Sequence, residues 1–175
     1  MNEANELSHI EEGLQQFAVE IDTIQLDPAN ARKHNEKNLA AIRGSLSAYK
    51  QRKLVIVNKN TNCIEAGNGT YTAGKALGWK WIAVLFVDDD PMTATGFAIA
   101  DNRTSELGTW DQEVLSQQLD AMALPGIEEL DEMFTDLIEA HQTPDFTPAP
   151  LSDQGKLDEM KMIHCPECGH EFHNK

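Results

Sequence analysis

Hydrophobic and polar positions follow two different periods along residues 16–111, and the changes of period mark strands and helices. Short runs rich in β-branched and aromatic residues predict strands, whereas apolar residues spaced three or four apart predict helices. The predicted strands cover residues 17–26, 53–57, 63–66 and 81–87. The predicted helices cover residues 36–49, 71–77 and 92–107, so strands and helices alternate as they do in α/β domains.

Turn and cap residues separate these elements. Residues 27–30 and 58–62 are typical of turns, and Asn35 is suited to cap the first helix. Residues 81–87 show no alternation, which predicts a central strand buried on both faces. The three aspartates at 88–90 stand before a proline, as in a turn followed by a helix cap, which we favour over a metal cluster.

Residues 67–70, with the sequence Gly-Asn-Gly-Thr, join the strand predicted at 63–66 to the helix that follows. A glycine turn of this kind directs backbone N–H groups and the positive end of a helix at one point, where a phosphate or another anion binds. Many such turns need glycine only for its positive φ and bind nothing. The pattern therefore leaves an anion site and an empty turn both open.

Pattern and composition divide the chain into five parts. Residues 1–15 form an acidic arm that we expect to be flexible or weakly helical, and residues 16–111 form the α/β domain. Residues 112–142 predict a helical extension. Residues 143–160 contain three prolines and predict a linker, after which residues 161–175 form a short module.

The helical extension carries an apolar stripe. Asp111 is suited to cap its first helix, which ends near residues 124–126. The second helix places five apolar residues on one face, namely Ile127, Leu130, Phe134, Leu137 and Ile138. Such a stripe predicts either internal packing or a dimer seam.

The charge of the chain is strongly unbalanced, with 29 acidic against 14 basic residues and a formal net charge of −15. A surface this acidic repels nucleic acid phosphates. Half of the basic residues nevertheless fall within residues 32–53, so one face can meet a phosphate-bearing ligand, although a solvated helix face explains the same lysines. These residues are Arg32, Lys33, Lys37, Arg43, Lys50, Arg52 and Lys53.

Membrane insertion and secretion are not predicted. The longest apolar run, residues 81–87, is far shorter than the ~20 residues that span a bilayer. Residues 1–15 contain no Lys or Arg and lack the apolar stretch of a secretory signal. Three cysteines, two of them close together, do not make a disulfide framework, which favours a cytoplasmic protein with a thiol or metal site.

Four blocks of residues follow the order found in a known family. They are residues 26–34 (LDPANARKH), 45–46 (SL), 67–78 (GNGTYTAGKALG) and 98–103 (AIADNR). In these blocks the chain resembles the ParB/sulfiredoxin superfamily, specifically the phage-type ParB-like N-terminal (ParB-like nuclease) domain proteins. The resemblance implies a small α/β (α+β) domain with a mixed sheet. It further implies a homo-oligomer that acts on DNA, or with a DNA-processing protein, in phage or mobile-element DNA transactions within a bacterial host cell.

The resemblance also implies a nucleotide site. In characterised relatives the glycine turn and its helix hold the phosphates; some members bind and hydrolyse CTP and clamp DNA, and others are serine kinases, sulfiredoxins or nucleases. Carried over by position, the nucleotide- or phosphate-binding residues are Asn30, Arg32, Gly67, Asn68, Gly69, Thr70, Thr72, Asn102 and Arg103. Asp101 becomes the candidate catalytic residue, and its carboxylate suits the Mg²⁺ that accompanies a nucleotide.

Two departures from the family narrow the activity. CTP-binding relatives carry arginines where this chain has Thr70 and Thr72, and hydroxyls bring no charge to a triphosphate. Sulfiredoxins have a reactive cysteine in the glycine block, where this chain has none, and Cys63 is expected to be a small buried apolar residue. Nucleotide or phosphate binding is the leading interpretation. The alternatives are a kinase, NTPase or nuclease with Asp101 or Glu65 as metal ligand or base, and an acidic adaptor with a vestigial cleft.

A second chemical signal lies in residues 161–175. The sequence Cys165-Pro-Glu-Cys168-Gly is typical of the knuckle in which two thiolates and backbone N–H groups surround one side of a structural Zn²⁺. Zinc takes four ligands, so either His170 and His173 complete the set or two chains each provide a cysteine pair. A reduced tail without metal is the alternative. A redox site is disfavoured, because no thioredoxin-like helix follows the first cysteine.

Overall fold

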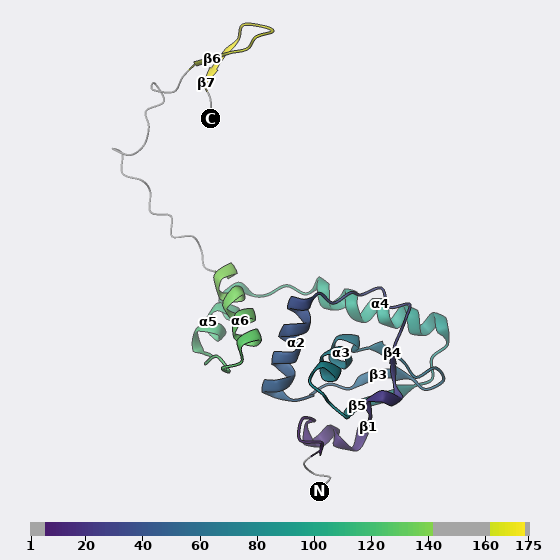
Figure 1. Cartoon of the computed structure of the whole chain (residues 1–175). Helices are drawn as coiled ribbons and strands as arrows, with labels where there is room; N and C mark the ends of the chain where they lie inside the picture. Colours follow the sequence, from purple (N-terminus) through teal and green to yellow (C-terminus); the bar gives the residue numbers. More distant parts are fainter. Residues whose placement is uncertain (1–5, 142–161, 174–175) are drawn as a thin grey trace. The chain divides into compact units, whose positions relative to one another are not determined.

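The computed structural model of the protein describes residues 6–141 and 162–173. The chain divides into two compact units, Met1–His141 and Gln142–Lys175, and each is described by itself (Figure 1). The linker predicted at residues 143–160 lies outside the described residues. Among the helices that the structure describes, none is both long enough and apolar enough to cross a lipid bilayer.

A five-stranded mixed sheet forms the centre of the described part of the first unit, with the strand order β1-β5-β3-β4-β2. Its strands are β1 Ala18–Glu20, β2 Gln25–Leu26, β3 Val55–Asn58, β4 Cys63–Ala66 and β5 Trp81–Val87. β3 runs antiparallel to β4 and parallel to β5, while β1 runs antiparallel to β5 and β2 runs parallel to β4. The predicted mixed sheet and the hairpin of β3 and β4 are therefore confirmed.

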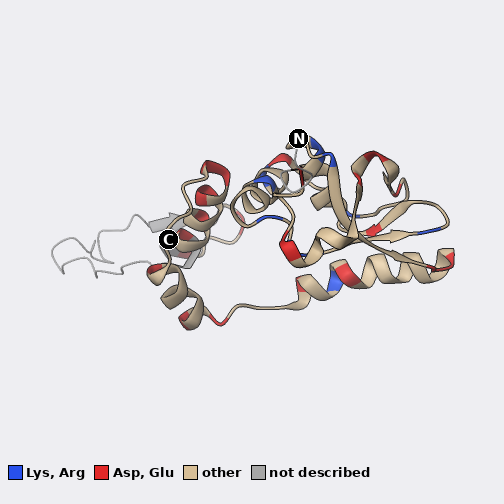
Figure 2. Cartoon of the chain, turned by 90° about the horizontal axis from the view of Figure 1, so that it is seen from below, with Lys and Arg blue, Asp and Glu red and all other residues tan. Residues whose placement is uncertain are grey.

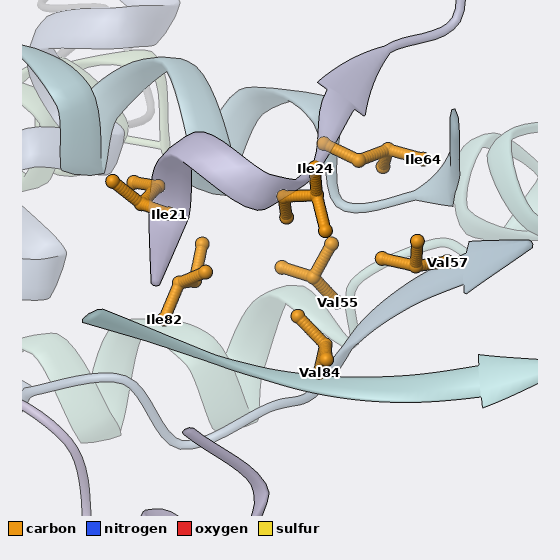
Figure 3. Packing of buried hydrophobic residues seen from close by; sticks show 7 residues of the cluster. All are labelled: Ile21, Ile24, Val55, Val57, Ile64, Ile82 and Val84. Atoms are coloured by element: carbon orange, nitrogen blue, oxygen red, sulfur yellow. The ribbon is translucent and has the colours of Figure 1, made fainter. Parts of the chain in front are cut away.

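The single strand predicted for residues 17–26 is wrong. This segment forms β1 at one edge of the sheet and β2 at the opposite edge, joined by the 3₁₀ turn η2 Ile21–Thr23. Ile21 and Ile24 are both buried in the core, with 2% and 3% of their surface exposed (Figure 3). Residues three apart face opposite sides of a strand but the same side of a 3₁₀ helix, so burying both isoleucines requires the break.

Five described helices accompany the sheet in the first unit. They are α2 Glu36–Tyr49, α3 Asn68–Ala76, α4 Pro91–Leu107, α5 Gln112–Ala121 and α6 Glu128–His141. The predicted caps are confirmed, because the side chains of Asn35, Asp90 and Asp111 accept hydrogen bonds from the first turns of α2, α4 and α5. Hydrogen bonds from the Thr93 hydroxyl and from the N–H groups of Thr93 and Met92 lower the pKa of Asp90.

The core is a cluster of buried residues from β3, β4 and β5 together with Ile21 and Ile24 (Figure 3). It is built from alternate residues of neighbouring strands, namely Val55, Val57, Ile64, Ile82 and Val84, against which Tyr71 of α3 packs. The predicted burial of β5 on both faces is confirmed over Ile82–Val84 and wrong beyond it, because Leu85 and Phe86 are 43% and 44% exposed. β1 pairs with residues 81–83 alone, so the second half of β5 is an edge of the sheet on that side.

Residues 6–17 belong to the folded unit, and the expectation of a flexible arm is wrong for them. Ile10 has no exposed surface and forms a parallel bridge with Gln51. Backbone hydrogen bonds join Gln51 N to His9 O at 2.9 Å and Glu11 N to Gln51 O at 3.0 Å. The short 3₁₀ helix η1 Glu12–Phe17 follows. A single isoleucine next to acidic residues gives no periodic pattern, so the sequence did not predict that Ile10 is buried.

Gln51, which precedes β3 in the chain, hydrogen-bonds to backbone groups of β5 that β3 does not reach. Its Nε2 donates to Ala83 O at 2.8 Å and to Lys53 O at 2.9 Å. Its Oε1 accepts from Ala83 N at 2.8 Å. Along β5, pairing with β3 begins at the next residue after Ala83, where Val84 pairs with Val55. The side chain of Gln51, which is 1% exposed, thus satisfies backbone groups that no strand residue reaches.

α6 packs against α2, and this contact explains part of its apolar stripe. Leu130 is 1% exposed. A Cβ on Gly44 of α2 would lie 3.0 Å from both the Cβ and the backbone N of Leu130, so only glycine permits this approach. Of the two explanations for the stripe, internal packing is therefore confirmed at Leu130.

Candidate functional site

The glycine turn joins β4 to α3, as predicted. Gly67 stands at the N-cap position of α3 with a φ of 98°, and a Cβ on it would lie 3.1 Å from Val55 Cγ2. A Cβ on Gly69 would lie 2.8 Å from Ile42 Cδ1 and 2.9 Å from His34 Cε1. Backbone conformation and close packing alone account for both glycines. The glycines by themselves do not distinguish an anion site from an empty turn.

A polar cavity of about 180 Å³ opens beside this turn. Its walls come from the loop before α2, from the turn between β4 and α3, and from α4. Most of the site residues predicted from the sequence line it together: Asn30, Arg32, Gly67, Asn68, Gly69, Thr70, Asp101 and Asn102. The hydroxyl of Thr72 instead donates to Asn68 O within α3, at 2.9 Å. The tertiary structure thus assembles one cavity from three distant segments of the sequence.

A second cavity of about 340 Å³ adjoins the polar cavity and shares Asn30, Arg32 and Asn102 with it. It lies between the loop at residues 27–32 and α4, and Arg103 lines it. Several of its other lining residues are apolar, namely Ala29, Ala31, Ala98 and Ile99. The pair of cavities suits a ligand with one charged part and one less polar part.

Asn30 organises the loop that carries Arg32. Its Oδ1 accepts from Arg32 N and its Nδ2 donates to Arg32 O, both at 3.1 Å. Its backbone N donates to Asp27 O at 3.0 Å, which confirms the turn predicted at residues 27–30. These bonds make Asn30 a positioning residue for the Arg32 backbone.

Arg32 and Arg103 converge on one carboxylate. Arg32 Nη1 lies 2.8 Å from Glu106 Oε1, and Arg103 Nη1 lies 3.2 Å from Glu106 Oε2. Glu106 was not predicted as a site residue. Its pairing with Arg103 has the helical i, i+3 spacing and could have been predicted from the sequence. Its pairing with Arg32 spans 74 residues of chain and therefore depends on the fold.

Two acceptor oxygens beside the polar cavity are buried without a hydrogen-bond partner in the described structure, Glu65 Oε2 and Asn68 Oδ1. Glu65 is 5% exposed, and its other oxygen accepts from Asn58 Nδ2 at 2.9 Å. Asn58 is in turn held by Asp89 O, to which its Nδ2 donates at 2.9 Å. The sequence pointed to Glu65 because it is an ionisable residue inside the strand predicted at residues 63–66. A buried acceptor without a donor indicates a place for a ligand or an ion.

Asp101 and Asn102 approach the polar cavity from α4. Asp101 is exposed, and Asn102 Nδ2 donates to Ala98 O in its own helix at 2.7 Å. Within residues 6–141 and 162–173, no group of three or more His, Cys, Asp or Glu side chains is placed to hold a metal ion. Glu65, Asn68 and Asp101 nevertheless offer hard oxygen atoms around one cavity, which is the donor chemistry that Mg²⁺ prefers when a phosphate completes its shell.

The described part of the second unit is a β-hairpin of β6 Met162–His164 and β7 Glu171–His173 (Figure 1). Cys165 and Cys168 both lie between the two strands in the sequence. Hydrogen bonds from the backbone N–H groups of Cys168 and Glu167, and from the Cys168 thiol, lower the pKa of Cys165. The side chain of the predicted ligand His173 lies outside the described residues. The hairpin therefore has the backbone shape of the predicted knuckle, and zinc binding stays a prediction.

Comparison with known proteins identifies the fold. No family model matches the chain, and no curated protein matches it. Among solved structures, it is similar to the C-terminally truncated chromosome-partitioning protein ParB from Caulobacter crescentus complexed with CTP-gamma-S. The TM-score is 0.55 and the sequence identity 14%, over 65% of this chain and 69% of that chain.

Two further solved structures are similar at lower TM-scores. ParB from Caulobacter crescentus complexed to the centromeric parS site has a TM-score of 0.41 and 17% identity, over 73% of each chain. A Pnob8-like ParB-N domain has a TM-score of 0.42 and 16% identity, over 89% of this chain and 55% of that chain. The predicted fold class is confirmed by the likeness to the CTP-gamma-S complex: the protein has a ParB-like α/β fold with a mixed sheet.

Proposed function

We propose that this protein is a nucleotide- or phosphate-binding ParB-like module. The main support is a pair of buried acceptor atoms beside the glycine turn, Glu65 Oε2 and Asn68 Oδ1. Neither atom has a hydrogen-bond partner in the described structure. A buried polar atom without a partner costs about 1–3 kcal/mol, so a ligand or cation that satisfies both atoms is favoured. The fold supports a nucleotide, because the similar Caulobacter crescentus ParB is complexed with CTP-gamma-S.

In the proposed complex the phosphates lie in the polar cavity. The N–H groups at the start of α3, the guanidinium of Arg32 and the hydroxyl of Thr70 donate to phosphate oxygens. The nucleoside part occupies the adjoining cavity between the loop at residues 27–32 and α4, where apolar side chains shield it from water. Arg103, which lines that cavity, adds a second positive charge.

We propose Mg²⁺ as the cation of this site. Glu65 and Asp101 repel a phosphate by themselves, and a divalent cation between carboxylate and phosphate reverses that repulsion. Glu65 Oε2, Asn68 Oδ1 and the carboxylate of Asp101 are the atoms that would hold it. The cation supplies charge neutralisation, and the two arginines supply the directional hydrogen bonds.

We also propose that the module acts in phage or mobile-element DNA transactions in the cytoplasm of a bacterial host cell, as a homo-oligomer. Residues 104–141 contain no Lys or Arg, and acidic residues recur along α5 and α6 (Figure 2). The whole chain has a formal net charge of −15, and this acidic part of it repels DNA phosphates. A DNA-processing protein with a basic surface is therefore the favoured direct partner.

The binding proposal predicts that CTP, ATP or ADP with Mg²⁺ gives measurable heat in isothermal titration calorimetry with the full chain. Removing one charged donor from a phosphate costs about 1.5–3 kcal/mol, so Arg32→Ala should weaken binding by roughly 10- to 150-fold. Glu65→Gln keeps the side-chain shape but removes the charge, and it should abolish the benefit of Mg²⁺ over EDTA.

The matched control is Arg43→Ala, which removes the same charge from α2, where Arg43 pairs with Glu36 at 2.8 Å and lines neither cavity. It should leave the affinity within about twofold, because Arg43 lines neither cavity and salt screens the loss of a charge at a distance. Absence of heat with every nucleotide in the unsubstituted protein would refute the proposal.

Glu106→Gln is predicted to strengthen nucleotide binding. Glu106 neutralises Arg32 and Arg103 in the free protein, and a phosphate must compete with its carboxylate. Exposed ion pairs contribute about 0.2–1 kcal/mol each, so removing both should raise the affinity by roughly 2- to 30-fold. Calorimetry with the same nucleotides measures this change. Glu36→Gln is the control, and an equal gain in that variant would show that the effect comes from overall charge.

A further inference from the structure

The turn between β6 and β7 brings two thiols together on a fixed backbone. Cys165 N donates to His170 O and Gly169 N donates to Cys165 O, both at 2.9 Å. Gly169 has a φ of 68°, a conformation that favours glycine. The Cys165 sulfur also accepts from the N–H groups of Glu167 and Cys168. This is the backbone arrangement in which a metal-binding knuckle presents two sulfur ligands to one ion.

A redox function does not fit this turn. Reactive Cys-x-x-Cys pairs place the first cysteine at the N-terminus of a helix, whose dipole activates the thiolate. Cys165 instead follows a three-residue strand and leads into a turn. The strands β6 and β7 are three residues each, which is too little for folding by burial of apolar surface, so a metal would supply the stability.

The described hairpin offers two ligands, whereas zinc takes four. Among residues 162–173, no third His, Cys, Asp or Glu side chain that the structure describes joins the two thiols in a metal-sized group. His164 Nδ1 instead lies 3.3 Å from Glu171 Oε1. The remaining cysteine of the chain, Cys63, belongs to β4 of the first unit, where Gln25 Nε2 lies 3.6 Å from its sulfur.

We infer that Cys165 and Cys168 form half of a Zn²⁺ site, which the same pair from a second copy of this chain completes. A second copy supplies two thiolates of matching geometry, giving the four-sulfur set of structural zinc sites. Cys165 is half-buried and Cys168 is exposed, so the sulfur pair is open to a second hairpin. The 20 residues between α6 and the hairpin, 142–161, separate the pair from the rest of its own chain along the sequence.

The test combines metal analysis with light scattering on the full chain purified in the presence of zinc. The shared site predicts one zinc for every two chains and a dimer that chelation of the metal weakens. The double variant Cys165→Ser with Cys168→Ser should lose the zinc and the chelator-sensitive part of the association. Cys63→Ser is the matched control and should retain both, because Cys63 lies outside the hairpin.

Two results would overturn this inference. One zinc per chain in a monomer would mean that His170 and His173 complete the site within one chain, and His170→Ala with His173→Ala would then lose the metal. Zinc-free protein that is unchanged by the cysteine substitutions would mean that the hairpin binds no metal. Neither result depends on nucleotide binding, so the outcome is independent of the proposed function. Circular dichroism of each variant checks that the first unit stays folded.

Discussion

Gln51→Leu is expected to lower the free energy of unfolding by about 3–5 kcal/mol, because three backbone groups would lose their partners in a buried site. These groups are Ala83 N, Ala83 O and Lys53 O, which the carboxamide of Gln51 contacts at 2.8–2.9 Å. Water has little access, since Gln51 is 1% exposed. Urea denaturation should show a lower midpoint with an unchanged slope.

Gln16→Leu is the control for this prediction. Gln16 is exposed, and its side chain donates to Gly13 O at 3.2 Å. Surface substitutions of this kind change stability by less than about 0.5 kcal/mol. A loss below 1 kcal/mol for Gln51→Leu would mean that water or a backbone shift satisfies the three groups, and that residues 6–17 are held mainly by the burial of Ile10.

Leu130→Ala is expected to lower the free energy of unfolding by about 2–5 kcal/mol, the range for truncating a fully buried leucine. Leu130 is 1% exposed and lies against Gly44, where no side chain is present to fill the space that the substitution creates. The loss should be the same at two protein concentrations tenfold apart. A concentration-dependent loss would show that the stripe of α6 also forms a seam between chains.

Leu124→Ala serves as the control for this second prediction. Leu124 lies between α5 and α6 and is 47% exposed, so truncating it removes less apolar contact. We expect a loss below about 1 kcal/mol, in proportion to the smaller buried area. Similar losses at the two positions would contradict the assignment of Leu130 to the core.

Local patterns were sufficient to predict most of the elements in residues 27–121. The caps Asn35, Asp90 and Asp111 were identified because a short polar side chain just before an apolar period has one common role. The glycine turn was identified because a strand and a helix flank it. These features depend on residues within a few positions of one another, which is the range over which sequence patterns carry information.

The errors came from contacts between distant segments. Residues 17–26 appeared as one strand, because the break at Ile21 is required by a core that contains Ile64 and Ile82. Ile10 appeared to belong to an arm, because the surface that buries it is made by Gln51 and β5. The pattern of apolar residues within either segment contains no information about these distant contacts.

In the candidate site, local sequence patterns were enough to identify the residue types and to place the glycine turn between β4 and α3. The sequence also determined the strongly acidic charge and the cysteine spacing of the hairpin. Two features became visible only in the folded chain: Arg32 and Arg103 both pair with Glu106, and Glu65 is buried with one oxygen that has no partner among the described residues. The physical reason is that ion pairing and burial depend on distance in space, and 74 residues of chain separate Arg32 from Glu106.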